Sequence, residues 1–191
     1  MKKLALILSA FFVVTAFTNG FGTWENDDPH SQLGFTVKHL GIADVSGTFN
    51  DIDVKVTAAK PDFSDAQFEL TARTASVDTR VEARNKHLKT ADFFDAEKYP
   101  TLSFKSTAIK PAGKNKYRLS GDLTMHGVTK PVTLNLLYTG TVENPMSKKA
   151  TSGFQLTGTV KRSDFGIGAG FPAAMISDEV RIKADGEFIK Q

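Results

Sequence analysis

The 191-residue sequence contains no cysteine, and this absence excludes several kinds of protein together. Without thiols the chain has no disulfide, no thiolate metal site and no cysteine nucleophile. Its four histidines are not paired at the spacing of zinc ligands, and no HExxH motif occurs. The GxSxG motif of serine hydrolases and a complete glycine-rich dinucleotide motif are also missing. We therefore expect no metal ion, no cofactor and no catalytic residue, and a binding protein in place of an enzyme.

The sequence also has little excess of charge of either sign. Lysine and arginine number 24 against 21 aspartates and glutamates, which gives a formal net charge of +3. The positive residues are not gathered into the clusters that contact nucleic-acid phosphates. We expect no nucleic-acid partner.

Long apolar runs are confined to the N-terminus. Lys2 and Lys3 precede an apolar run from Leu4 to Phe17, and small or polar residues follow it. The run is shorter than the roughly 20 residues that a membrane span needs. This order predicts a secretory signal peptide in residues 1–22 and one domain in residues 23–191. A retained N-terminal anchor is the alternative.

The rest of the chain alternates apolar and polar residues, which is the pattern of strands with one buried face. The phase reverses at Asn50–Asp51, where we expect a bend. In the long connection between Asp78 and Tyr99, apolar spacing predicts a short helix over Thr79–Thr90. About eight such strands close into a barrel or stack as a two-sheet sandwich. The alternating segments lie around residues 33–37, 45–49, 52–56, 68–72, 102–106, 117–125, 132–138, 154–160 and 180–188, and 52–56 continues 45–49 across the bend, which makes eight strands.

Phenylalanine and glycine are distributed in a way that bears on the interior. The chain has 15 phenylalanines and one tryptophan. Four glycines lie in register with the apolar residues that are expected to point inward. Glycine in a strand leaves space where a side chain would pack, so the pattern favours a cavity for a long apolar guest. A filled core is the alternative, in which these glycines only ease bends. The four are Gly47, Gly121, Gly158 and Gly186.

Five stretches carry the most distinctive motifs of the chain: Asp28–Phe49, Ser76–Thr107, Leu119–Leu134, Val160–Gly168 and Ile176–Phe188. Together they resemble the YceI-like family of bacterial periplasmic proteins, also called polyisoprenoid-binding. The resemblance runs from about Trp24 to Phe188. It implies an all-β fold, an eight-stranded antiparallel extended barrel of lipocalin type with a short helix in the 78–99 connection. It further implies an apolar tunnel that stores or transports a polyisoprenoid, an isoprenoid quinone or a related long-chain amphiphile in the periplasm.

The segment "RNKHLKTADFFDAEKYP", Arg84–Pro100, is a candidate lid for that tunnel. Basic residues precede the apolar pair Phe93 and Phe94. Our hypothesis is that the two rings seal the apolar tail while Arg84 or His87 contacts a phosphate or quinone oxygen, since the planar arginine fork suits phosphate. The alternative is an ordinary helix whose phenylalanines plug the barrel end.

The other candidate lipid-binding residues are phenylalanines, each of which also fits a plain core position. Two rival functions stay open: an enzyme acting on a lipid head group with His87 as base, and a structural sandwich without ligand. Transient membrane contact and a homodimer are also left open. The candidates are Phe35, Phe49, Phe68, Phe104 and Phe154 for the tunnel wall, and Phe165 and Phe171 for a tunnel mouth.

Overall fold

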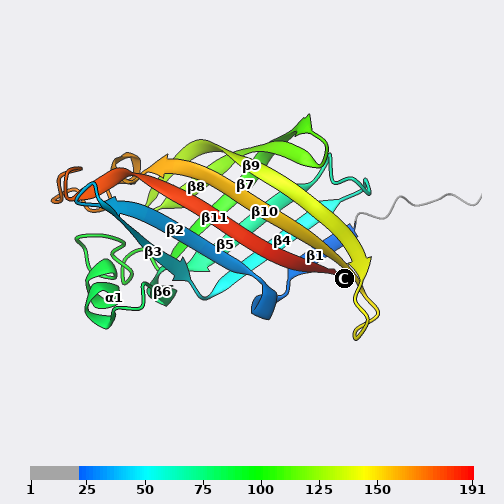
Figure 1. Cartoon of the computed structure of the whole chain (residues 1–191), viewed down its shortest axis with the longest axis horizontal. Coiled ribbons are helices and arrows are strands. Elements are labelled where there is room, and N and C mark those ends of the chain that lie inside the picture. The colour runs from blue at the N-terminus through cyan, green and yellow to red at the C-terminus, as the bar shows by residue number, and fades with distance from the viewer. Residues whose placement is uncertain (1–21) are drawn as a thin grey trace, which may run out of the picture.

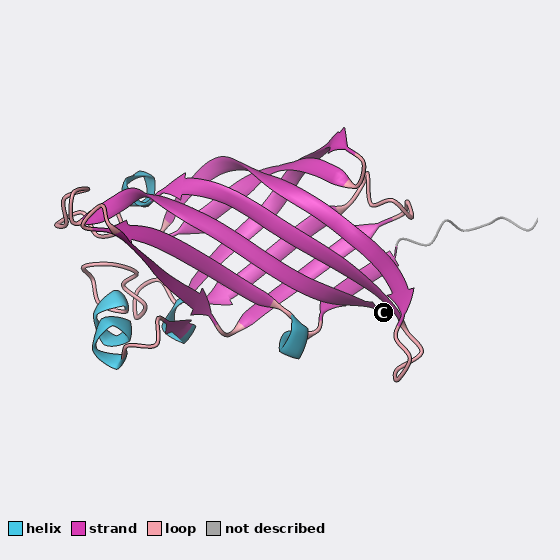
Figure 2. Cartoon of the chain, in the orientation of Figure 1, coloured by secondary structure: helices cyan, strands magenta, loops and turns pink. Residues whose placement is uncertain are grey.

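The computed structural model describes residues 22–191, which form one antiparallel sheet with a short α-helix (Figures 1 and 2). The predicted signal peptide, apart from Gly22, lies outside the described residues. The strands are β1 (Gly22–Asn26), β2 (Gln32–His39), β3 (Ala43–Phe49), β4 (Ile52–Ala58), β5 (Gln67–Arg73), β6 (Val77–Asp78), β7 (Thr101–Gly113), β8 (Lys116–Met125), β9 (Val128–Glu143), β10 (Ala150–Lys161) and β11 (Ile176–Lys190). The helices are α1 (Glu82–Leu88) and the 3-10 turns η1 (Asp28–His30), η2 (Thr74–Ser76) and η3 (Arg162–Phe165).

Eight of the strands close into a barrel. Their order is β1-β4-β5-β7-β8-β9-β10-β11, and β11 pairs again with β1. The predicted eight-stranded antiparallel barrel is therefore confirmed, and the two-sheet sandwich is wrong because the sheet closes on itself. Closure leaves few free edges for pairing with other chains.

The first two strands behave as one strand interrupted by η1. The last residues of β11 pair with β1, as in Asn26↔Phe188, while its earlier residues pair with β2, as in Leu33↔Ala184. On the other side of this pair, β4 lies against β1 and β3 lies against β2. The break between β3 and β4 falls at Asn50–Asp51, where the phase reversal predicted a bend.

The connection that carries α1 covers the end of the barrel where β2 and β3 diverge from the ring (Figure 1). The helix is shorter than the predicted Thr79–Thr90, because Arg80 has a left-handed backbone (φ 62°) and Val81 is extended. Asn85 fixes this entry to the helix: its Oδ1 accepts hydrogen bonds from the backbone N and the hydroxyl of Thr79 at 2.7 and 2.6 Å. Across residues 22–191, none of the helices has the length and apolarity that crossing a bilayer requires.

The opposite end of the barrel is packed with aromatic rings. Phe63 lies edge-on to Trp24 and Phe154, with ring centroids 5.4 and 4.9 Å apart, and Phe154 lies edge-on to Phe68 and Phe188 at 5.4 Å. All five side chains are buried. Edge-to-face pairs add to the free energy gained by burying apolar area. This aromatic plug closes the interior at that end.

We expected the inward glycines to leave open space for a guest. In the structure, neighbouring side chains occupy that space. The ring of Phe35 lies over Gly47, and the ring of Phe104 lies over Gly121. A Cβ atom on Gly121 would stand 2.5 Å from both the carbonyl oxygen of Lys105 and Cζ of Phe104. Glycine at these positions lets a large ring from the next strand lie flat against the barrel wall.

Replacing Gly121 by alanine is expected to destabilise the barrel. The new methyl group collides with backbone as well as with a ring, so we expect the free energy of unfolding to fall by about 1–3 kcal/mol. Gly170→Ala is the control, because a Cβ atom added there would meet no atom of a non-adjacent residue within 4 Å. Urea unfolding measures both. Equal stability of the two variants would contradict the close packing of Phe104 on Gly121.

Candidate functional site

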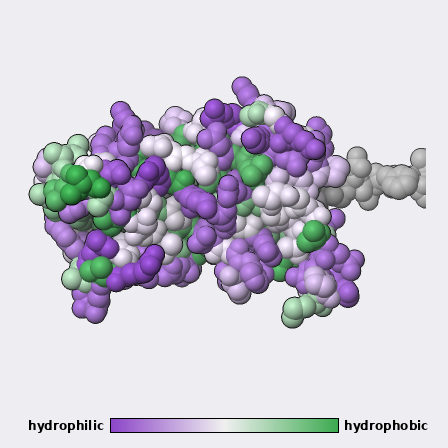
Figure 3. All heavy atoms as spheres, in the orientation of Figure 1, coloured by the Kyte–Doolittle hydropathy of each residue, from purple (hydrophilic) through white to green (hydrophobic). Residues whose placement is uncertain are grey.

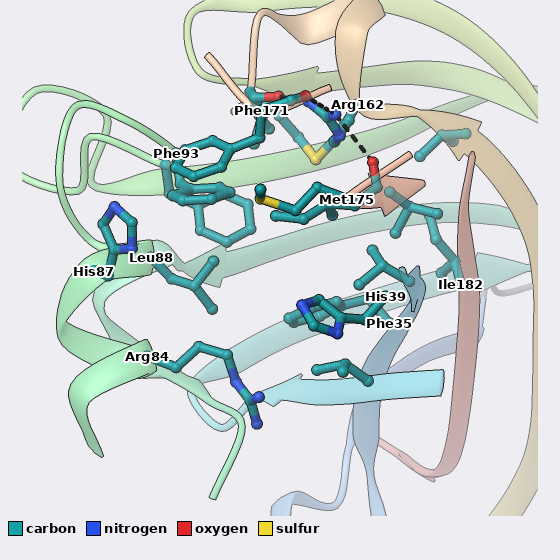
Figure 4. A pocket seen from close by; sticks show the side chains of 18 residues that line it. Phe35, His39, Arg84, His87, Leu88, Phe93, Arg162, Phe171, Met175 and Ile182 are labelled. Atoms are coloured by element: carbon teal, nitrogen blue, oxygen red, sulfur yellow. Dashed lines mark hydrogen bonds between the residues drawn. The ribbon is translucent and has the colours of Figure 1, made fainter. Parts of the chain in front are cut away.

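A cavity of about 310 Å³ lies inside the barrel at the α1 end (Figure 4). Alternate inward residues of β2 and β11 form one wall, including Phe35, Val37 and Ile182. Single residues of β3, β8 and β10 also line it, and the α1 connection and the loop 163–177 supply the rest of the cover. The cavity is therefore enclosed partly by rigid sheet and partly by two long connections.

Six of the predicted lipid-binding residues line this cavity: Phe35, Arg84, His87, Phe93, Phe94 and Phe171. Three others, Phe68, Phe104 and Phe154, line a second cavity of about 60 Å³ farther along the barrel. The remaining two line neither. Phe49 packs between Phe35 and Phe94, with centroid distances of 5.7 and 5.4 Å, and Phe165 is buried in the core. Lipid contact by any of these residues stays a prediction.

The two cavities follow one another along the barrel in place of the continuous tunnel that we expected. On β2, Phe35 borders the larger cavity and Leu33 borders the smaller; on β11, Ile182 and Ala184 do the same. The interior is interrupted because side chains fill the space above the inward glycines. Beyond the smaller cavity the aromatic plug closes the barrel.

The two long connections meet over the larger cavity. The ring of Phe93 stacks on Phe171 of the other connection, with centroids 4.9 Å apart and planes at 24°. His87 lies edge-on to both rings, at 5.0 and 5.7 Å. Phe94 points instead toward Phe49 at 5.4 Å, beneath α1. The two adjacent phenylalanines thus seal different parts of the cavity, one against the facing loop and one against the strands.

Two polar side chains predicted to act on a head group lie at the cavity margin (Figure 4). Nε and Nη2 of Arg84 donate to the hydroxyl and carbonyl of Thr79, at 2.8 and 2.9 Å. Among the described residues no hydrogen bond engages its Nη1. His87 Nε2 lies 3.0 Å from a carboxylate oxygen of Asp92. Arg84 is therefore held in position by Thr79 with donors left over for a ligand.

The most extensively bonded side chain of the site, Arg162, was not predicted from the sequence. It is only 7% exposed and lies at the start of η3. A guanidinium has five N–H donors, and here all five are used on backbone carbonyls. Its one sequence signal was a basic residue between a strand and a glycine-rich loop. The acceptors are Ser177 (from Nε, 3.2 Å), Ile167 and Gly168 (from Nη1, 3.0 and 2.6 Å), and Phe171 and Ile176 (from Nη2, 2.6 and 3.1 Å).

These bonds give the loop 163–177 a fixed shape over the cavity. Ser163 adds a second anchor by donating its hydroxyl and backbone N–H to Asp178, at 2.9 and 3.0 Å. The hydroxyl bond, with the backbone bond, holds the pKa of the Asp178 carboxyl below its usual value. Since every N–H of Arg162 is engaged, this side chain has no donor left for a ligand while the loop is closed.

Arg162→Met is expected to loosen the loop and lower the free energy of unfolding by about 3 kcal/mol, because carbonyls bonded to a charged donor lose their partners together. Arg181→Met is the matched control. Arg181 is exposed and pairs with Asp44 on the surface, where an ion pair contributes about 0–1 kcal/mol. Urea unfolding and amide exchange of residues 166–177 measure the difference. Unchanged exchange in Arg162→Met would show that the loop does not depend on the arginine.

The fold also brings together three ligand-type side chains that the sequence spacing did not connect. Oxygen or nitrogen atoms of Asp27, His30 and Glu187 lie within 4.8 Å of one another at the η1 corner. His30 Nδ1 lies 2.8 Å from a carboxylate oxygen of Asp27. This hydrogen bond, followed by the charges of Asp27 and Glu187, raises the pKa of His30 above 6.5. The group is exposed, so we interpret it as a surface ion pair.

The His30 imidazole is expected to titrate above pH 6.5, and Asp27→Asn is expected to bring its pKa back toward that value. Because the folded-state pKa is the higher one, the stabilisation is fully present below the unfolded pKa and is lost as pH rises through the folded pKa. NMR titration of the His30 ring measures the shift, with His39 as internal reference. A His30 pKa that does not respond to Asp27→Asn would rule out the pairing.

Comparison with known proteins agrees with this geometry. A family model described as the YceI-like domain matches residues 24–188. The chain belongs to the YceI-like family. A UPF0312 protein of Pseudomonas fluorescens is 40% identical over 149 residues, which cover 74% of each chain.

Two solved structures of this kind are similar to the chain. The Campylobacter jejuni YCEI protein has a TM-score of 0.74 at 30% identity, covering 81% of this chain and 90% of its own. A domain of Saccharophagus degradans described as polyisoprenoid-binding has a TM-score of 0.67 at 15% identity, covering 90% of this chain and 100% of its own. The second likeness concerns the fold alone. The YceI-like resemblance of the sequence is thus confirmed over the predicted span.

Proposed function

We propose that this protein binds an amphiphile with a long apolar chain, a polyisoprenoid or a similar lipid, in the cavity beneath α1, and stores or carries it in the periplasm. The observation that carries the proposal is the composition of the cavity wall. Apolar side chains form most of the wall, and its charged or ionisable members are Arg84, Arg162, His39 and His87. No carboxylate belongs to the described residues that line it. Such a wall accepts a hydrocarbon chain with an anionic or electron-rich head. The description of the Saccharophagus domain supports the same class of ligand.

The head group decides selectivity in this proposal. Transfer of each CH₂ from water is favourable by about 0.8 kcal/mol, but a bilayer offers the same gain, so the tail alone does not draw a lipid out of a membrane. Arg84 is the group that discriminates, because Thr79 fixes two of its nitrogens and Nη1 lies free at the margin. Arginine donates to phosphate or carboxylate in a planar, charge-assisted geometry.

The size of the cavity limits how much of the tail it holds. At about 30 Å³ per small group, the volume of a water molecule in the liquid, the 310 Å³ cavity takes on the order of ten chain atoms. A longer chain must extend into the smaller cavity or out of the mouth. The interrupted interior therefore matches a short chain as it stands, and a long isoprenoid requires the side chains between the cavities to change rotamer.

A catalytic role for His87 would require a second reacting group beside it, and the described residues of the cavity wall supply none. Its partner is Asp92, and both rings that flank it are apolar, Phe93 and Phe171. The described residues of the cavity wall include no serine, threonine or carboxylate that His87 would activate. We therefore propose a binding protein and no reaction.

The proposal is tested with protein purified from its native cells. We expect mass spectrometry of an organic extract to find a lipid with a polar head in near-stoichiometric amount. After delipidation, Arg84→Ala is expected to weaken binding of a prenyl phosphate by roughly ten- to a hundredfold, because a charge-assisted hydrogen bond contributes about 1.5–3 kcal/mol, and to leave binding of the matching prenyl alcohol unchanged.

Arg73→Ala is the control, since Arg73 is exposed and pairs with Asp51 outside the cavity. An empty extract together with no binding of either prenyl compound would refute the proposal. Equal losses for phosphate and alcohol would remove Arg84 from head-group recognition.

A further inference from the structure

The end of the barrel above the cavity carries exposed apolar residues at the tip of the β2–β3 hairpin. Ile42 is 84% exposed and Leu40 is 54% exposed. Figure 3 shows hydrophobic residues gathered at the end of the molecule where this hairpin and the loop 163–177 lie in Figure 1. Large apolar side chains gathered on a surface mark protein or membrane contacts more often than chance exposure does.

The backbone conformation of this tip makes a bulky apolar residue energetically costly. Leu40 and Gly41 both have left-handed backbones, with φ values of 50° and 71°, and Ile42 N donates to His39 O at 3.1 Å. Hairpin turns of this kind favour Asn-Gly or Asp-Gly, and a bulky side chain at positive φ is uncommon. Neither packing nor turn chemistry therefore accounts for leucine and isoleucine at this tip.

The exposed tip is continuous with the cavity wall. Leu40 N donates to the carbonyl of Met175 at 2.9 Å. Met175 is itself 42% exposed, and it lines the cavity together with His39. Met175 thus belongs to the cavity wall and is also bonded through its backbone to the exposed tip.

Formal charge is absent from the tip. From His39 to Ala43 no residue carries a fixed charge, and the nearest charges on the hairpin, Lys38 and Asp44, pair with each other at 2.8 Å. The tip is thus suited to a hydrocarbon environment and not to a charged partner surface.

We propose that the β2–β3 tip, with Met175, inserts into the interface of a lipid bilayer and places the cavity mouth against it, so that an apolar ligand passes between bilayer and cavity without crossing water. This inference rests on the proposed lipid-binding function, because docking on a bilayer serves the transfer of a lipid. Its driving force is burial of Leu40, Ile42 and Met175 among acyl chains, which is the way shallow interfacial anchors bind. A bilayer is the occupant because it is the source and destination of such a ligand.

Flotation with phosphatidylcholine vesicles tests the proposal. We expect the protein to float with vesicles, with little dependence on salt, and Ile42→Asp to reduce the bound fraction by about tenfold or more, given the free energy of burying one such side chain. Met146→Asp is the matched control. Met146 is 92% exposed in the β9–β10 connection, at the opposite end of the barrel (Figure 1), and its replacement is expected to leave flotation unchanged.

Three outcomes overturn the proposal. The first is a wild-type protein that does not float, and the second is equal loss in the two variants. The third is a wild-type dimer in sedimentation that Ile42→Asp abolishes without any vesicle binding, which would assign the tip to a second copy of this chain.

Prenyl alcohol binding to the same variants in solution separates this proposal from the proposed function. Binding retained by Ile42→Asp with flotation lost supports docking by the tip. Flotation without any ligand binding refutes the lipid-carrying function and leaves the docking surface standing.

Discussion

The shape of the loop that covers the cavity depends on one buried guanidinium. Arg162 lies where β10 ends, and its five N–H groups reach carbonyls between Ile167 and Ser177. A loop of this length with several glycines has large conformational freedom, and its ordering costs entropy. The arginine offsets that cost by gathering carbonyls that would otherwise turn toward water. The position of Phe171 over the cavity, and its stacking on Phe93, follows from this arrangement.

The barrel has two ends of different character because aromatic residues are distributed unequally along it. At the β1 end, rings from several strands interlock around Phe63 and Phe154 and leave only the smaller cavity of about 60 Å³ beside them. At the α1 end, β2 and β3 leave the ring, and long connections replace the missing wall. A cavity forms there because loops pack less completely than neighbouring strands. Aromatic packing is concentrated at one end, and the larger cavity and the exposed apolar tip lie at the other.

The two arginines of the cavity have opposite roles, although both lie beside the same space. Arg162 has every donor engaged by the loop, while Arg84 keeps Nη1 free beyond its two bonds to Thr79. A side chain that is fully bonded fixes the shape of a site, and one that is partly bonded is available to a ligand. On this difference rests our proposal that Arg84 contacts the ligand, while Arg162 fixes the shape of the loop.

The sequence by itself determined nine of the eleven strands, the bend at Asn50–Asp51 and the presence of a short helix between Asp78 and Tyr99, but it did not indicate β1 or β6. Each of these depends on neighbours within a few residues, through side-chain alternation or helical spacing. The motifs also carried the YceI-like resemblance, and thereby the barrel. Of the six predicted lipid-binding residues that line the larger cavity, only Phe35 lies on a strand, where its inward position follows from the period of the strand. The other five belong to α1 and the two long connections, which the sequence identified as candidate covers of the cavity by their length and composition.

Only the tertiary structure decided what fills the interior. Gly121 was interpreted as space for a guest, yet Phe104 from the neighbouring strand occupies that space. The role of Arg162 depends on carbonyls up to 15 residues away, and the Asp27–His30–Glu187 group depends on strand closure across the chain. The alternation within a strand indicates on which face of the sheet a residue lies. The atoms that it contacts across the barrel depend on the register of the strands and on the closure of the sheet, and no short stretch of sequence contains that information.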